Sequence, residues 1–176
     1  PEWEELINFG WRGWEGIFPT SILRVCPGNP ALNEKIIAYY DEAVITSVQR
    51  LQPLTCYFHQ DLRQDKFGAT ALTGVQPYMG TGIPALTGSV VFTDLARDEG
   101  SPPPARGILA YTRASMDCKL NDFGVIETDY DFGSASSYYM SLRTNLDQTR
   151  LFLGVYCSMK VTDYNQGTVF EIGAPL

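Results

Sequence analysis

Short runs of β-branched and aromatic residues, separated by turn residues, are the feature that most constrains this chain. From residue 21 onwards these runs alternate with clusters of glycine, proline, aspartate and asparagine, a pattern typical of strands joined by turns. The pattern predicts an all-β protein, an antiparallel β-sandwich with a jelly roll of about eight strands. The predicted strands lie at residues 22–26, 43–51 with a continuation at 54–58 after Pro53, 70–75, 88–93, 107–114, 123–128, 138–143, 151–162 and 168–172.

Helix is expected only in one or two short pieces. Residues 31–40 favour a short helix or an irregular turn, directly after the turn sequence Pro27-Gly28-Asn29-Pro30. With 16 glycines, 11 prolines and only 19% charged residues, the composition excludes a helical bundle. The 44% of hydrophobic residues can supply a core, which excludes wholesale disorder. The length of 176 residues predicts a single jelly-roll β-sandwich domain over residues 21–176.

The first twenty residues differ from the rest and form a predicted N-terminal strap, residues 1–20. All three tryptophans, Trp3, Trp11 and Trp14, lie here among closely spaced glycines, which prevent a long helix. One interpretation is a strap whose rings pack across the surface of the domain. The other is an aromatic platform that binds a ligand or a partner, since stacking sites also collect tryptophan.

Charge and hydropathy exclude two classes of partner. The chain has a formal charge of −7, and its 13 lysines and arginines are scattered singly. Nucleic-acid binding is usually built from clustered basic residues that displace counterions from phosphates, so we expect no direct binding of nucleic acid. No apolar run approaches the ~18 residues that cross a bilayer, so we expect no membrane span.

Cysteine and histidine usage disfavours a zinc site. Cys26, Cys56, Cys118 and Cys157 are widely spaced and His59 is the only histidine, whereas zinc ligands usually recur at short spacing. Each cysteine has apolar or β-branched neighbours, which predicts buried free thiols. One or two disulfides are the alternative.

Alternating carboxylates give the strongest candidate for a metal site. On an extended chain the period of two places Glu127, Asp129 and Asp131 on one face. Three such oxygen donors could hold Ca²⁺, and two of them could act as an acid and base pair. The third interpretation is a solvated acidic face with no metal. A second acidic pair, Asp61 and Asp65, is interpreted as part of a polar loop.

No enzyme motif survives inspection. Gly80-Thr81-Gly82 lacks the third glycine and the following helix of a dinucleotide-binding turn, and the phosphate-binding loop sequence is missing. His59 has no serine nucleophile in a suitable elbow sequence. We therefore expect a protein that is not an enzyme, with no catalytic residue and no cofactor apart from the calcium alternative.

Two stretches resemble a known family. Residues 25–32, 36–40 and 41–53 combine a strand ending in Cys-Pro-Gly-Asn-Pro, a connection ending in Tyr-Tyr-Asp, and a long strand running to Pro53. This order is similar to the opening of the jelly roll in coat proteins of small non-enveloped icosahedral RNA viruses, and residues 150–161 are similar to the last strand of that family. Two features of the family have no close match: its basic RNA-neutralising arm, and the paired aspartates that bind Ca²⁺ between subunits, near which only the more widely spaced Asp61 and Asp65 lie.

The resemblance implies a viral structural protein. Such a capsid subunit or capsid domain would assemble with identical subunits in the virion, enclose the genome, and contribute to host attachment through a receptor or a glycan. The alternative from the residues is a carbohydrate- or peptide-binding β-sandwich module that uses the tryptophan strap with Tyr138 and Tyr139. A third hypothesis is a glycoside hydrolase that acts through Glu127 and a partner aspartate.

Overall fold

The computed structural model divides the chain into two compact units. One unit contains Pro1–Cys56 with Asp117–Lys119, and the other contains Tyr57–Met116 with Leu120–Leu176. The residues that the structure describes are 7–8, 14–15, 18–19, 49–50, 53–57, 71–97, 106–113, 119–120, 123–133, 135–158 and 163–174.

Described residues of the first unit take part in three short strand pairs. Ile7–Asn8 pairs in parallel with Gln49–Arg50, and Trp14–Glu15 pairs antiparallel with Phe18–Pro19. The predicted helix at 31–40 and most of the predicted strap at 1–20 lie outside the described residues. The pairs are β1 (Ile7–Asn8) with β4 (Gln49–Arg50), β2 (Trp14–Glu15) with β3 (Phe18–Pro19), and β5 (Thr55–Cys56) with β9 (Lys119–Leu120).

The second unit contains a four-stranded antiparallel sheet. Its strand order is β10-β8-β7-β6, so neighbours along the sheet also follow one another along the chain, apart from β9. The only helical turn among the described residues, η2 (Pro84–Leu86), lies in the connection between β6 and β7. The strands are β6 (Leu72–Tyr78), β7 (Ser89–Asp94), β8 (Ile108–Arg113) and β10 (Gly124–Val125).

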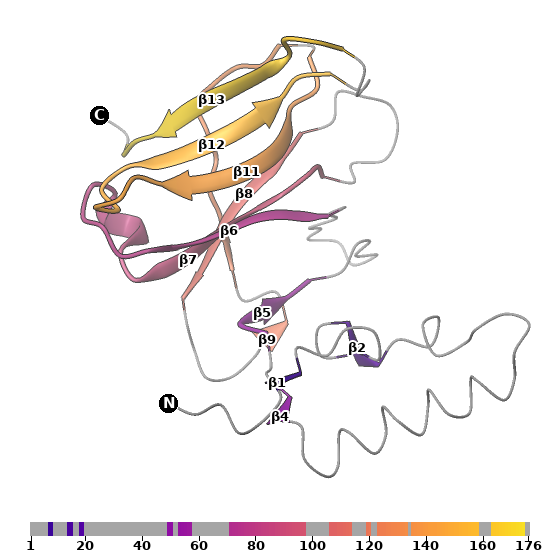
Figure 1. Ribbon diagram of the computed structural model, residues 1–176, viewed down its shortest axis with the longest axis vertical. Coiled ribbons are helices and arrows are strands. Elements are labelled where there is room, and N and C mark those ends of the chain that lie inside the picture. The colour runs from indigo at the N-terminus through magenta and orange to yellow at the C-terminus, as the bar shows by residue number, and fades with distance from the viewer. Residues whose placement is uncertain are drawn as a thin grey trace, which may run out of the picture. The chain divides into compact units, whose positions relative to one another are not determined.

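A second antiparallel sheet follows in the order β11-β12-β13. Its strands are β11 (Tyr138–Thr144), β12 (Leu151–Tyr156) and β13 (Gly167–Ile172), with one irregularity in register between Tyr139 and Ser141. In β12 buried positions alternate with half-buried ones, as expected for a strand that turns one face to a core. Figure 1 shows this sheet in orange and yellow beside the magenta strands of the first sheet.

Side chains from both sheets form one hydrophobic core. The cluster joins buried residues of the four-stranded sheet and its β6–β7 connection to buried residues of the three-stranded sheet: Tyr78, Ile83, Leu86, Val91 and Leu109 with Tyr139, Leu142, Leu151, Leu153 and Val155. A hydrogen bond from a side chain to the backbone also joins the sheets, because the Thr73 hydroxyl on β6 donates to the carbonyl of Tyr139 on β11 at 2.6 Å. The two sheets therefore share a single interior.

A buried carboxylate organises a smaller second cluster. Asp94 is 1% exposed and accepts hydrogen bonds from the Tyr57 hydroxyl at 2.9 Å and from the backbone N–H of Ala71 at 2.9 Å. The ring of Tyr57 packs against Phe92 and Phe123. Burial, and then the charge of Asp94, raise the pKa of Tyr57 well above its usual range. Because its pKa is raised, the Tyr57 hydroxyl keeps its proton and donates a hydrogen bond to Asp94.

The prediction of an all-β protein is confirmed, and most predicted strands between residues 70 and 172 lie close to observed ones. The prediction at 123–128 is too long, because β10 contains only Gly124 and Val125. Beyond Ile126, whose N–H donates to the carbonyl of Leu109, the chain turns through a bend in which Asp131 accepts a hydrogen bond from the N–H of Gly133.

The prediction at 70–75 is too short. β6 continues through Pro77, which is tolerated on a strand at the edge of its sheet.

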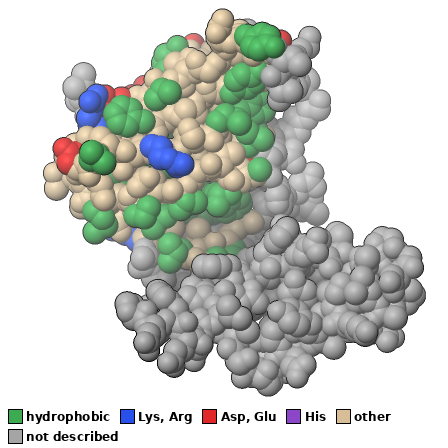
Figure 2. Space-filling model, in the orientation of Figure 1, with side chains coloured by type: hydrophobic (Ala, Val, Ile, Leu, Met, Phe, Trp, Pro, Cys, Tyr) green, Lys and Arg blue, Asp and Glu red, His purple; other side chains and the backbone are tan. Residues whose placement is uncertain are grey.

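Apolar side chains and few charges occupy the face of the second unit drawn in Figure 2. Several large hydrophobic side chains on the strands are exposed, among them Leu72 and Val75 on β6, Met140 on β11 and Val169 on β13. Scattered exposed hydrophobic residues are ordinary in monomers, whereas several on neighbouring strands are typical of a surface that another protein covers.

A candidate binding pocket between β8 and β11

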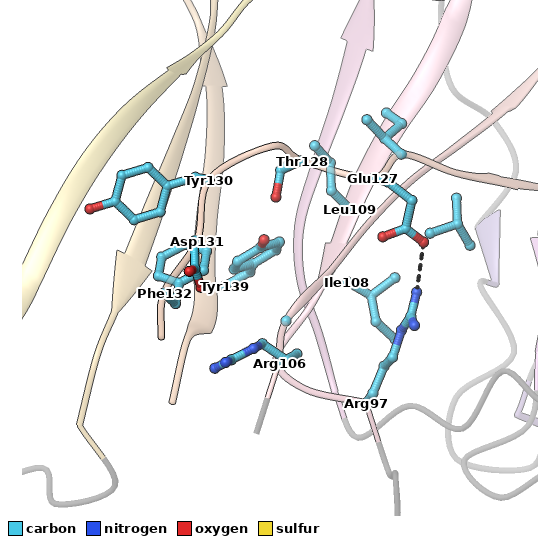
Figure 3. Close-up of a pocket in the computed structure, with 13 residues that line it drawn as sticks. Arg97, Arg106, Ile108, Leu109, Glu127, Thr128, Tyr130, Asp131, Phe132 and Tyr139 are labelled. Carbon is cyan, nitrogen blue, oxygen red and sulfur yellow. Dashed lines mark hydrogen bonds and ion pairs between the residues drawn. The ribbon is translucent and has the colours of Figure 1, made fainter. Parts of the chain in front are cut away.

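A cavity of about 250 Å³ lies in the second unit. It is lined by the start of β8, by Val125 at the end of β10, by residues 126–128 and 130–132 after it, and by Tyr139 on β11, with two arginines at its edge. Figure 3 shows the Arg97–Glu127 pair on one side of the cavity and Tyr130 with Phe132 on the other. Charged and aromatic side chains therefore face a common space.

The two arginines are brought together by the connection between β7 and β8. The backbone N–H of Arg97 donates a hydrogen bond of 2.6 Å to the carbonyl of Arg106. The guanidinium of Arg97 lies 3.3 Å from the carboxylate of Glu127, in an ion pair whose side chains are 34% and 82% exposed. An ion pair as exposed as this one contributes little to stability, so its groups can exchange partners when a ligand arrives.

Arg106 is held in place by backbone carbonyls. Its guanidinium donates to the carbonyl of Gly133 at 2.6 Å and to that of Ala135. The same bend is closed by Asp131, whose carboxylate accepts a hydrogen bond of 2.7 Å from the N–H of Gly133, and Gly133 has a φ of 59°. Positive φ is easy for glycine. Arg106 and Asp131 together therefore fix the bend that forms one rim of the cavity.

Aromatic rings form a wall of the cavity. Tyr130, 57% exposed, lies 4.8 Å from Phe132 and 4.7 Å from Phe170 between ring centroids. Phe132 is in turn 6.5 Å from the buried ring of Tyr139. These separations are typical of favourable aromatic pairs. The cluster holds the Tyr130 ring at the rim while leaving more than half of that residue in contact with solvent.

Gly107, in the lining of the cavity, packs closely against the ring of Tyr139. A Cβ placed on Gly107 would overlap the ring of Tyr139. We expect Gly107→Ala to push this ring toward the cavity and to lower the free energy of unfolding by about 1–3 kcal/mol, the usual cost of overpacking. Thermal denaturation measures the effect. Gly173→Ala is the control, because a Cβ there meets nothing within 4 Å, and equal melting temperatures for the two variants would contradict the prediction.

The three predicted acidic residues do not converge on one metal site. Glu127, Asp129 and Asp131 are all exposed, but of the two residues between them only Thr128 is half-buried, because Tyr130 is exposed as well. Glu127 and Asp131 line the cavity. Among the residues that the structure describes, no three His, Cys, Asp or Glu side chains are placed to hold a metal ion. Calcium binding by the three acidic residues stays a prediction.

Other predicted site residues lie largely outside the described part of the chain. This applies to Trp3, Trp11, His59, Asp61 and Asp65, and Trp14 is described only as part of β2, without its side chain. Cys56 is buried and Cys157 is a half-buried free thiol, while Cys26 and Cys118 lie outside the described residues. Tyr138 and Tyr139 have different surroundings, because Tyr138 is half-buried and Tyr139 is 5% exposed in the shared core.

The arginines of the cavity were not predicted from the sequence. Arg97 and Arg106 mark the two ends of a segment rich in proline, whose composition indicates only an exposed loop. The available signal was topological: because β7 and β8 are antiparallel neighbours, the residues that end one strand and begin the next lie close together.

No described segment forms a helix long and apolar enough to cross a membrane. Comparison of the chain with models of protein families, with curated proteins and with solved structures finds no match.

Proposed function

We propose that this chain is a viral structural protein, a subunit or a domain of an icosahedral capsid that assembles with identical subunits in the virion and encloses the genome. The proposal is supported by the all-β fold and by the resemblance of residues 25–53 and 150–161 to jelly-roll coat proteins. Two antiparallel sheets around one core are the basis of a β-sandwich. The activity is assembly, with no covalent chemistry.

The jelly-roll part of the proposal requires a long-range strand pairing. A jelly roll contains Greek keys, in which a returning strand lies beside one that is distant in sequence. Both described sheets of the second unit are instead meanders of consecutive strands. No such pairing occurs among the described strands of these two sheets, so the jelly-roll topology stays a prediction from the sequence.

Exposed apolar side chains on the sheets are the observation that carries the proposal. Val75 on β6 is 49% exposed and Met140 on β11 is 48% exposed, and their strands pack against each other through Thr73 and Tyr139. With Leu72, also exposed, they are large apolar side chains on two strands that pack against each other. A neighbouring subunit would remove this surface from water, which is the main driving force of protein association.

Because of its charge, we propose that the single subunit does not bind RNA and that the assembled shell encloses the genome. The chain has a net charge of −7, and its sequence contains no cluster of basic residues of the kind that releases counterions from phosphates. In this proposal the subunit encloses RNA without binding it directly, and host attachment takes place through a receptor or a glycan.

Sedimentation velocity tests the proposed assembly surface. We expect the purified chain to sediment as large assemblies and Val75→Asp with Met140→Asp to sediment as a single chain, because two buried carboxylates without partners would be costly. Leu146→Asp is the matched control, since Leu146 is fully exposed in the β11–β12 connection. A wild-type chain that stays monomeric would refute the capsid proposal, and a double variant that assembles normally would refute this surface.

A carbohydrate- or peptide-binding module is the second candidate function. The observation that favours it is the cavity beside β8, where aromatic rings and charged groups meet. Such a module would bind its ligand as a single small unit, so the sedimentation experiment separates the two functions.

A further inference from the structure

The charges around the cavity are balanced. Arg97 and Arg106 contribute two positive charges, and Glu127 and Asp131 contribute two negative charges. A ligand with a net charge would be attracted by the residues of one sign and repelled by those of the other, so the site favours a neutral ligand. Guanidinium groups only donate hydrogen bonds and ionised carboxylates only accept them. The matching ligand group is a hydroxyl, which both donates and accepts.

The rings beside these charges favour a ligand with an apolar face. Tyr130 is 57% exposed at the rim, and its ring is braced by Phe132 and Phe170. Such a rigid ring offers a large contact area at a low cost in conformational entropy. A ligand that has hydroxyls at its edge and C–H groups on one face satisfies both walls of the cavity at once.

Volume and rigidity limit the size of the ligand. The cavity measures about 250 Å³, below the range of roughly 300–1,000 Å³ that is usual for small-molecule pockets, so it accommodates about one six-membered ring with its substituents. Arg106 is already held by the carbonyls of Gly133 and Ala135. Because this donor is already held in place, it loses little conformational freedom when a ligand binds. Even a small ligand with few contacts can therefore bind.

We propose that this cavity binds one neutral hexose unit, with a C–H face of the sugar against Tyr130 and its hydroxyls between the Arg97–Glu127 pair and Arg106. The inference does not depend on the capsid proposal, and it deepens the second candidate function by naming the ligand of its cavity. A capsid subunit and an unassembled module could carry the same sugar site.

Saturation-transfer difference NMR on the full chain tests the site. The probes are D-galactose, D-glucose, D-mannose and N-acetyl-D-glucosamine, with N-acetylneuraminic acid as a charged comparison. We expect at least one neutral sugar to bind with a Kd in the millimolar range, about the strength available to a ligand of so few atoms. Its ring C–H protons should receive the strongest saturation, and N-acetylneuraminic acid should bind more weakly.

Two substitutions at exposed positions locate the binding. Tyr130→Ser removes the ring at the rim, and Glu127→Ala removes an 82% exposed carboxylate, so both variants should fold. Each should weaken binding by about fivefold or more, equivalent to roughly 1 kcal/mol. Leu146→Ser, at a fully exposed residue of the β11–β12 connection, should bind as the wild type does. The proposal is overturned if no neutral sugar binds, if Tyr130→Ser binds as well as the wild type, or if the charged sugar binds more tightly.

Discussion

Gly80→Ala should lower the melting temperature of the protein by about 10 °C, which corresponds to a loss of roughly 3 kcal/mol. The reason is a close approach between two connections. A Cβ on Gly80 would overlap the backbone carbonyl of Gln148, and one on Gly82 would overlap the carbonyl of Thr149. Backbone atoms cannot swing aside as a flexible side chain can, so the β6–β7 and β11–β12 connections would have to separate.

Separation of these connections would also break specific hydrogen bonds. The hydroxyl of the fully buried Tyr78 donates to the carbonyl of Thr149 at 3.1 Å and accepts from the N–H of Ile83 at 3.0 Å. The N–H of Met79 donates to the side-chain oxygen of Gln148 at 3.1 Å. Buried groups that lose their partners cost about 1–3 kcal/mol each.

Thermal denaturation followed by circular dichroism measures the effect of Gly80→Ala. Gly167→Ala is the matched control, because a Cβ at Gly167 meets nothing within 4 Å, and it should melt close to the wild type. If Gly80→Ala melts with the control, the two connections do not pack as described.

Leu142→Ala should destabilise both sheets of the second unit and not only its own. Leu142 on β11 is fully buried, pairs in register with Leu153 on β12, and belongs to the cluster that contains Val91 on β7. Truncation of a buried leucine costs about 2–5 kcal/mol. Because the core is shared, this loss should reach β7 as well as β12.

Hydrogen exchange resolves where the loss in Leu142→Ala appears. We expect faster exchange of backbone amides in both β7 and β12, since a shared core opens as one cooperative unit. Leu146→Ala, at a fully exposed leucine of the same region, should leave exchange unchanged. Faster exchange confined to β11–β13 would show that each sheet has a separate core.

The strands between residues 70 and 172 could be predicted because their residues satisfy a local rule. Gly88 to Thr93 and Tyr138 to Arg143 combine β-branched or aromatic residues with turn residues at both ends, and observed strands β7 and β11 lie there. The end of β10 could not be predicted in this way. It depends on a bend that is closed by Asp131 and by the reach of Arg106 to distant carbonyls.

The candidate pocket depended even more on contacts that are distant in sequence. Glu127, Asp129 and Asp131, which alternate in the sequence, are all exposed in the structure. Their alternation gave no indication that Arg97 would pair with Glu127, because these residues come from different strand connections. Similarly, Gly80 and Gly82 failed as a nucleotide-binding motif, and their role in close packing depends on the backbone of residues 148 and 149.

Negative-stain electron microscopy of the purified chain tests the capsid proposal most directly. The apolar residues Leu72, Val75 and Met140, exposed on adjacent strands of the second unit, would be covered by identical subunits in a shell. The proposal predicts closed particles of uniform diameter at micromolar protein concentration, and their loss in Val75→Asp with Met140→Asp. A field of single small molecules at every concentration and salt condition would contradict it.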